Sequence, residues 1–168
     1  MAEGEAVNEV LKSVEARYGF VPNLLREMSR SPAALRVYLD GQAAIAGSRL
    51  TPAERQLVQL AVSIYNECEY CRAAHRTGCH TAGIAPSEIE LVEKGALPED
   101  RRRRALVSAA WQVLDMRGFL APTDLASLEA EGVDRGQLYE VVALIALKTL
   151  SNYVNHIAHT PVDEAFRD

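Results

Sequence analysis

Two cysteines, a histidine and a third cysteine follow one another at helical spacing near the middle of this chain. The segment Glu67–His80 reads ECEYCRAAHRTGCH, in which two residues separate Cys68 from Cys71 and His75 comes four residues after Cys71. A helix that starts at or just before Cys68 turns about 100° per residue, so the three cysteines and His75 fall within roughly an 80° arc. Cys68 and Cys71 then lie about one turn apart, where a disulfide can form, and His75 lies one turn beyond Cys71.

A redox dithiol needs this arrangement. The thiolate is the nucleophile, and the positive end of the helix dipole favours it at Cys68 and Cys71. His75 can accept the Cys71 proton, directly or through water. Cys71 would attack a peroxide oxygen to become a sulfenic acid, which Cys68 would resolve as a disulfide.

Two other interpretations of the cysteines stay open at this point, namely metal ligands and packed, inert thiols. A zinc site would combine Cys68 and Cys71 with His75 and either Cys79 or His80. A continuous helix holds Cys68 and Cys79 roughly 16 Å apart, whereas zinc needs ligands within about 2.0–2.3 Å of one point. We interpret Cys79 as a packed thiol.

The segments that position these residues are predicted to be helical almost throughout. No segment alternates apolar and polar residues in the manner of a strand, and Ser31-Pro32 and Thr51-Pro52-Ala53-Glu54 are typical helix starts. We therefore expect an all-α, single-domain helical bundle over residues 1–168. The predicted helices cover about 6–17, 22–28, 32–46, 87–94, 99–117, 123–131 and 135–159. Two further helices are predicted to start at about 52 and at or just before 68.

Composition and charge exclude several classes of protein. The chain has 168 residues, of which 48% are hydrophobic and 24% charged, and a net charge of −5 gives no basic footprint for nucleic acid or anionic lipid. No signal-like segment follows the acidic start, and the longest nearly apolar run, Val141–Leu147, is far shorter than the roughly 20 residues that span a bilayer. An odd number of cysteines argues against a secreted disulfide framework, so we expect a cytoplasmic protein that binds neither nucleic acid nor membrane.

Several motifs resemble the alkylhydroperoxidase D (AhpD)-like, carboxymuconolactone decarboxylase superfamily, and in particular its peroxidase-related members. The resemblance covers nearly the whole chain and implies an all-helical protomer that forms trimers or hexamers and has thiol-dependent peroxidase activity. It divides the chain into an N-terminal lead-in (1–50), the redox-motif helices (51–82) and C-terminal helices (86–168). The motifs are LTPAERQ at 50–56, LAVS at 60–63, NECEYCRAAH at 66–75, YGFVPNL at 18–24 with SPAAL at 31–35, NYVNH at 152–156 and PVDEAF at 161–166.

Carried over residue by residue, the resemblance implies that Cys71 attacks the peroxide, Cys68 resolves it and His75 relays the proton. Gln56 stands where the family's relay begins at a glutamate, and a glutamine can orient water or His75 but cannot accept a proton. Glu54 and Glu69 are secondary candidates for that role. Tyr70 is also a candidate site residue, since some members carry a second histidine there.

We therefore predict a peroxidase that reduces hydrogen peroxide or organic hydroperoxides without metal, haem or flavin. Its reducing equivalents come from an external dithiol. One alternative is a redox-sensing oligomer without turnover, which the glutamine at position 56 keeps open. Another is a lactone decarboxylase, whose chemistry has no use for paired thiols.

Three further features are assigned structural roles. Arg101–Arg104 point all round a helix and are expected to be solvated or to bridge an interface. His156 and His159 are expected to pack in the core or at an interface rather than bind a metal. The run Val141–Leu147 makes the last helix apolar on most sides, which predicts contact between subunits.

Overall fold

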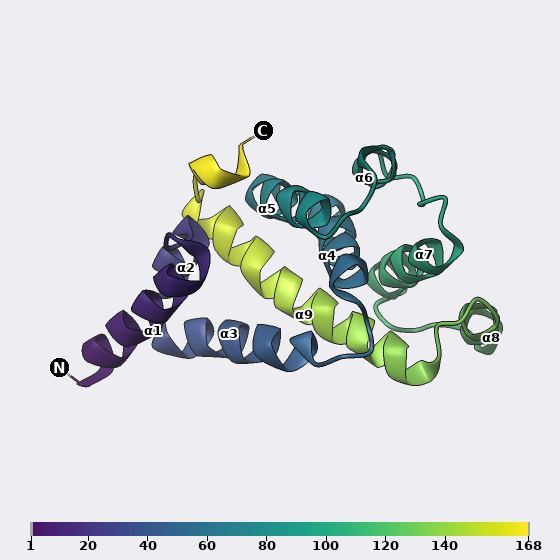
Figure 1. The fold of residues 1–168 in the computed structure, drawn as a ribbon. Helices are drawn as coiled ribbons and strands as arrows, with labels where there is room; N and C mark the ends of the chain where they lie inside the picture. The colour runs from purple at the N-terminus through teal and green to yellow at the C-terminus, as the bar shows by residue number, and fades with distance from the viewer. Residues whose placement is uncertain (1, 168) are drawn as a thin grey trace.

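The computed structural model describes residues 2–167, which form nine α-helices and one short 3-10 helix and include no β-strand. Figure 1 shows their order along the chain. The all-α class predicted from the sequence is confirmed. The helices are α1 (Ala2–Tyr18), α2 (Asn23–Met28), α3 (Pro32–Ala46), α4 (Pro52–Tyr65), α5 (Glu69–Thr81), α6 (Pro86–Glu93), α7 (Arg101–Met116), α8 (Pro122–Ala130), α9 (Arg135–Ala158) and the 3-10 helix η1 (Glu164–Phe166).

The helix starts follow from local chemistry. The Ser31 hydroxyl accepts a hydrogen bond from the backbone N–H of Ala34, and Thr51 and Glu54 form a reciprocal capping box at the start of α4. The predicted starts of α2, α5, α6 and α8 shift by one residue, that of α7 by two and that of α1 by four. Pro22 is the cap of α2 rather than its first helical residue, and α5 begins at Glu69 with Cys68 as its N-cap.

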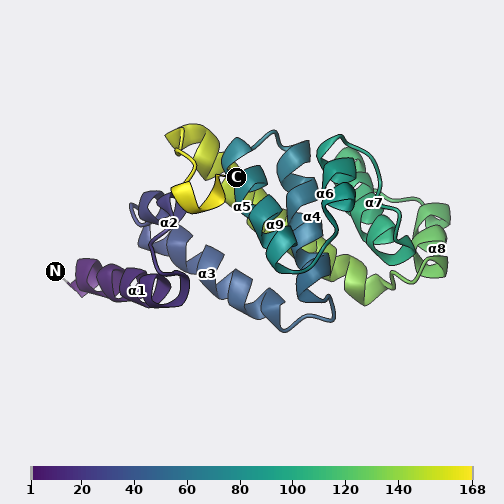
Figure 2. The same cartoon turned by 45° about the horizontal axis from the view of Figure 1, so that its top comes forward.

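The 24-residue helix α9 is the axis of the molecule. It packs against α2 and α3 on one side and against α4, α5 and α7 on the other. Figures 1 and 2 show the same division, with α1, α2 and α3 gathered on one side of α9 and α4 to α8 on the other. A residue on α9 can therefore face both the N-terminal lead-in and the redox helix α5.

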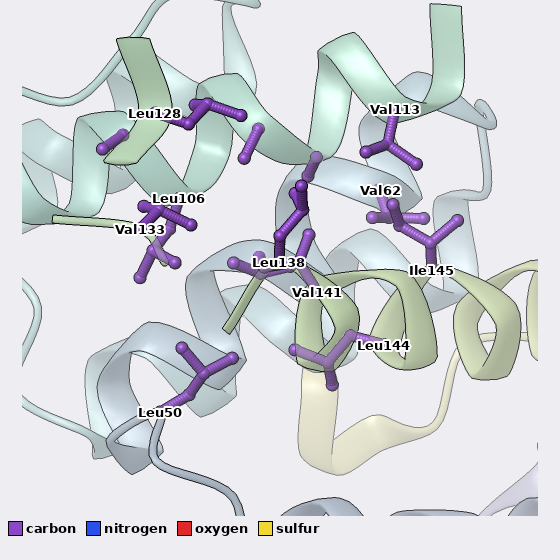
Figure 3. Close-up of a cluster of buried hydrophobic side chains, with 14 of the residues drawn as sticks. Leu50, Val62, Leu106, Val113, Leu128, Val133, Leu138, Val141, Leu144 and Ile145 are labelled. Carbon is purple, nitrogen blue, oxygen red and sulfur yellow. The ribbon is translucent and has the colours of Figure 1, made fainter. Parts of the chain in front are cut away.

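The side chains that hold this arrangement form three apolar clusters. The largest joins α4, α7, α8 and α9, and Figure 3 shows Leu106, Val141 and Leu144 among its members. A second joins α4, α5, α6 and α7 around Leu60 and Cys79. The third lies where α1, α2 and α3 meet α5 and α9, and it contains Cys68 and Cys71. Burying a leucine or valine contributes about 1.5–3 kcal/mol, so these clusters fix where α5 lies against α9.

The four arginines at the start of α7 contact acidic side chains and backbone carbonyls of the same protomer. Arg102 binds Glu54 of α4 at 2.9 Å, and Arg103 binds Glu88 of α6 at 2.7 Å. Arg101 and Arg104 donate instead to the carbonyl oxygens of Ala130, Pro98 and Glu99.

Within residues 2–167, no helix combines the length and the apolar character needed to cross a lipid bilayer.

Candidate active site

The turn between α4 and α5 places Cys68 at the start of the redox helix. Glu67 adopts a left-handed conformation (φ 56°), and its N–H donates to the carbonyl of Ile64 while the Cys68 N–H donates to that of Ser63. These two bonds are those of a Schellman motif, which ends a helix and turns the chain away. Cys68 is thus both the last residue of the Schellman motif that ends α4 and the N-cap of α5.

The two thiols are buried together against α9. Cys68 and Cys71 are 2% and 1% exposed and both are free. The Asn155 side-chain N–H donates to Sγ of Cys71 at 3.2 Å and lies 3.9 Å from Sγ of Cys68. The hydroxyl of Ser151 lies 3.8 Å from Sγ of Cys71. One face of α9 therefore supplies polar contacts to both sulfurs.

The surroundings of the pair make the two thiols unlike. A hydrogen bond from Cys68 lowers the pKa of Cys71 well below its usual value, against an opposing effect of burial, and the charge of Lys148 and the Ser151 and Asn152 side chains add to the lowering. The same shared hydrogen bond, together with burial, raises the pKa of Cys68. These shifts favour the thiolate at Cys71 and the thiol at Cys68.

His75 is held by Gln56, which lies on α4. Nδ1 of His75 is 2.8 Å from Oε1 of Gln56, and because a carbonyl oxygen only accepts, Nδ1 is the donor in this contact. Burial, and then the charge of Lys148, lower the pKa of His75 well below its usual value. The ring is therefore neutral near pH 7, which leaves Nε2 as an acceptor.

A glycine makes room for this contact. A Cβ atom on Gly78, one turn after His75, would lie 2.4 Å from Oε1 of Gln56 and 2.7 Å from its Cδ. Real Cβ contacts are longer than this, so the Gln56 amide lies where it does because residue 78 has no side chain.

Lys148 is the residue at this site that the sequence analysis missed. It lies on α9, is 1% exposed and has its ammonium 5.8 Å from the ring centre of Tyr38. Its charge acts on both Cys71 and His75. A signal was present in the sequence, because Lys148 is the one charged residue among the fifteen between Glu140 and His156.

Asn152 and Asn155 were noted only as part of a motif, and the structure gives them a place at the thiols. Asn152 is fully buried, and its Oδ1 accepts a hydrogen bond of 2.9 Å from Asn66, the residue that caps the end of α4. Its amide also lowers the pKa of Cys68 and of Cys71. With Lys148 and Ser151, these asparagines form a polar stripe along an otherwise apolar helix.

The secondary candidates make no hydrogen bond to the sulfurs, although Tyr70 belongs to the apolar cluster that contains them. Glu54 is engaged by Thr51 and Arg102 at the start of α4. The hydroxyl of Tyr70 donates to Asp163 and accepts from the Leu24 N–H, which ties α5 to the C-terminal segment and to α2. Glu69 is exposed and lines a surface cavity of about 690 Å³ between α5 and residues 159–167, which Tyr70 and Ala73 also line and which the thiols and His75 do not.

The remaining cysteine and histidines are also separate from the site. Cys79 is fully buried in the α4–α7 cluster, and burial raises its pKa to about 12. His156 is exposed beside the ring of Tyr153, rather than packed in the core, and His159 caps α9 and lines the surface cavity. Over residues 2–167, no three His, Cys, Asp or Glu side chains are grouped as ligands for one metal ion.

Comparison with known proteins is consistent with this arrangement. Residues 32–99 match the carboxymuconolactone decarboxylase family. No curated protein matches the sequence significantly. The match to the family thus includes α3, α4, α5 and α6 and every site residue outside α9.

Three solved structures share the fold over nearly the full chain. An uncharacterized peroxidase-related protein with an AhpD core, from Ralstonia eutropha JMP134, has 23% identity and a TM-score of 0.86, covering 96% of this chain and 87% of that one. Another peroxidase-related protein, from Silicibacter sp. TM1040, has 18% identity and a TM-score of 0.83, covering 97% and 90%. The debrominase Bmp8 has 16% identity and a TM-score of 0.78, covering 99% and 90%, and a variant of it is known in complex with 2,3,4-tribromopyrrole.

Proposed function

We propose that the chain, whose residues 32–99 match the carboxymuconolactone decarboxylase family and whose fold is that of peroxidase-related proteins, is a thiol-dependent peroxidase acting on hydrogen peroxide or organic hydroperoxides. One observation carries the proposal. Two free, buried thiols one turn apart have pKa values displaced in opposite directions, so one is suited to attack and the other to resolve.

The proposed reaction proceeds in three steps. The Cys71 thiolate attacks the terminal oxygen of the hydroperoxide, the S–O bond forms as the O–O bond breaks, and the leaving alkoxide takes up a proton to become an alcohol. The Cys68 thiol then attacks the sulfenic acid on Cys71, forming the disulfide and releasing water. An external dithiol reduces that disulfide by exchange and is itself oxidised to a disulfide.

The other site residues orient these steps. Asn155 donates to the attacking sulfur at 3.2 Å and keeps it directed towards Cys68. His75, held by Gln56, lies one helical turn from Cys71, and its free Nε2 can relay a proton to the leaving alkoxide. The chemistry uses the two sulfurs alone, so the proposal includes no metal, haem or flavin.

We further propose that the protein works as a homo-oligomer, a trimer or a hexamer. The face of α9 that points away from the bundle carries large apolar side chains at Tyr139, Val142, Tyr153 and Ile157, which are 42–82% exposed. They recur along the whole helix, and contiguous exposed apolar surface of this kind marks an interaction site. We call this set the outer face of α9.

Rapid mixing of the reduced protein with hydrogen peroxide and with cumene hydroperoxide tests the peroxidase proposal. Thiol loss and trapped sulfenic acid are followed in wild type, Cys71→Ser, Cys68→Ser and His75→Ala. We expect fast oxidation that is absent in Cys71→Ser, a persistent sulfenic acid in Cys68→Ser and a lower rate in His75→Ala.

Two results would contradict the proposal. Oxidation no faster than that of a free cysteine would favour a redox sensor without turnover. Because one structural neighbour is a debrominase, 2,3,4-tribromopyrrole is the comparison substrate. Cysteine-dependent loss of its bromine without hydroperoxide turnover would assign the thiols to dehalogenation instead.

A further inference from the structure

The lysine beside the thiols is a buried charge whose purpose the proposed reaction leaves open. Lys148 is 1% exposed, and burying an ammonium ion is costly unless an anion or a polarisable group compensates it. The face of Tyr38 lies 5.8 Å from its Nζ. The other groups whose charge stabilises the ammonium are the sulfurs of Cys71 and Cys68, and the pKa of Lys148 is raised despite its burial.

The position of Lys148 on α9 explains how it reaches these sulfurs. Lys148, Ser151, Asn152 and Asn155 recur every three to four residues, so they share one face of the helix. The later members of this face contact the thiols directly, with Asn155 3.2 Å and Ser151 3.8 Å from Sγ of Cys71. Tyr38, which Lys148 approaches, packs against the same cluster that contains Cys68 and Cys71.

We propose that Lys148, and not His75, is the cation that holds Cys71 as a thiolate in the resting protein. The inference rests on the proposed function only for its effect on turnover, since the effect of the Lys148 charge on Cys71 requires no peroxide. It makes Lys148 an electrostatic partner of Cys71 and leaves His75 a neutral ring in the resting state.

The alternative, an imidazolium at His75, is disfavoured by its neighbours. It would place a second cation close to Lys148 in a buried site, where charges of the same sign repel strongly. Gln56, which contacts Nδ1, carries no charge that could stabilise an imidazolium, as a glutamate there would. The uncharged partner of His75 at position 56 and the buried lysine at position 148 therefore agree with a neutral His75 ring.

The proton balance closes with Lys148 in this role. In the resting state Cys71 has given its proton to Lys148. Attack on the hydroperoxide gives the Cys71 sulfenic acid and an alkoxide, and the ammonium proton neutralises the alkoxide to the alcohol, which leaves a neutral amine. Exchange with the external dithiol then returns both cysteines as thiols, and Cys71 passes its proton to the amine again.

Titration of the thiolate by its ultraviolet absorbance tests this assignment without peroxide. The variants are Lys148→Met, which keeps the length of the side chain and removes the charge, Lys148→Arg, which restores a cation, and His75→Ala. The Cys71→Ser variant supplies the background for each difference titration. At pH values below the wild-type midpoint, we expect the fraction of Cys71 thiolate in Lys148→Met to be lower than in wild type by about tenfold or more. A tenfold change corresponds to ~1.4 kcal/mol.

Lys148→Arg should recover most of that loss, and His75→Ala should leave the titration near that of wild type. A Lys148→Met titration that matches wild type would overturn the inference, and so would a change in His75→Ala as large as that in Lys148→Met. Should Lys148→Met fail to fold, the wild type and His75→Ala still decide, because a thiolate absent from wild type near neutral pH, or lost in His75→Ala, would overturn the inference. A protein that lacks peroxidase activity but shows the expected titrations would disprove the proposed function and retain this inference.

Discussion

At the scale of single residues, Gly78 controls the contact between Gln56 and His75. A glycine in a helix ordinarily gains about 0.8–1 kcal/mol of stability when replaced by alanine. A Cβ at position 78 would instead meet the Gln56 amide at 2.4 Å and push it off Nδ1 of His75. We expect Gly78→Ala to show no such gain in urea unfolding and to slow peroxide turnover about tenfold, because the relay loses its orientation.

Gly47 offers the matched control for that substitution. A Cβ there would meet only the carbonyl oxygen of Ala44, at 3.5 Å, and the backbone has an ordinary φ of −87°. Gly47→Ala should leave turnover unchanged. Equal turnover in the two alanine variants would show that the position of Gln56 does not matter to the reaction.

His75 also makes a testable contribution to the pH dependence of stability. Its pKa is lowered in the folded state, so between the folded value and about 6.5 the unfolded chain binds a proton that the folded protein does not. Stability from this residue is complete above about pH 6.5 and is lost as the pH falls, by up to ~1.4 kcal/mol per pH unit. Urea unfolding of wild type and His75→Gln at about pH 7 and pH 5 measures this contribution. We expect the free energy of unfolding to fall less between the two pH values in the variant than in wild type. Parallel losses in the two proteins would contradict the lowered pKa.

At the scale of elements, the turn before the redox helix contains strain that can be removed. Glu67 holds a left-handed conformation, which costs a residue with a side chain about 1–2 kcal/mol, while glycine adopts it freely. Glycine loses more conformational entropy on folding, which offsets part of the relieved strain. Glu67→Gly should therefore raise the free energy of unfolding in urea by about 0.5–1 kcal/mol. Disulfide formation between Cys68 and Cys71 should be unchanged.

Glu67→Ala separates conformation from charge in this experiment. It removes the same carboxylate but keeps the strained backbone, so its free energy of unfolding should lie within about 0.5 kcal/mol of that of wild type. An alanine variant as stable as the glycine variant would assign the gain to the lost charge.

The sequence predicts those elements whose causes are local. Ser31 and the Thr51–Glu54 box specify helix starts through side chains a few residues from the backbone groups they bind, and the structure contains both. The spacing of Cys68, Cys71 and His75 likewise requires only the helix that carries them. The fold class and the redox segment were accessible for this reason.

Contacts between distant elements cannot be predicted from the sequence in the same way. Asn155 contacts Cys71, and the charge of Lys148 acts on it, across more than seventy residues of chain. A helical pattern shows that the two residues share a face without showing what that face meets. The apolar run Val141–Leu147 dominated the interpretation of α9, so its polar stripe was overlooked. The sequence signal for Lys148 is that of a lone lysine in an otherwise apolar helix.

At the scale of the whole molecule, α9 has two opposite faces, one that contacts the thiols and one that is exposed. The inner face carries Lys148, Ser151, Asn152 and Asn155 to the thiols. The outer face carries Tyr139, Val142, Tyr153 and Ile157, which in an isolated protomer remain exposed to water. Because one helix forms both, a subunit contact on the outer face would also restrain the helix that orients the attacking sulfur.

A charge on the outer face should therefore separate the subunits. Ile157 is 82% exposed, so Ile157→Lys costs the folded protomer little, whereas a lysine buried between two apolar helices would weaken their contact by several kcal/mol. Phe119 is equally suited as a control, since it is 80% exposed and lies in the turn after α7, away from this face. Light scattering after gel filtration should give an oligomer for wild type and Phe119→Lys and a smaller species for Ile157→Lys. A monomeric wild type, or dissociation by the Phe119 substitution alone, would place the interface elsewhere or remove it.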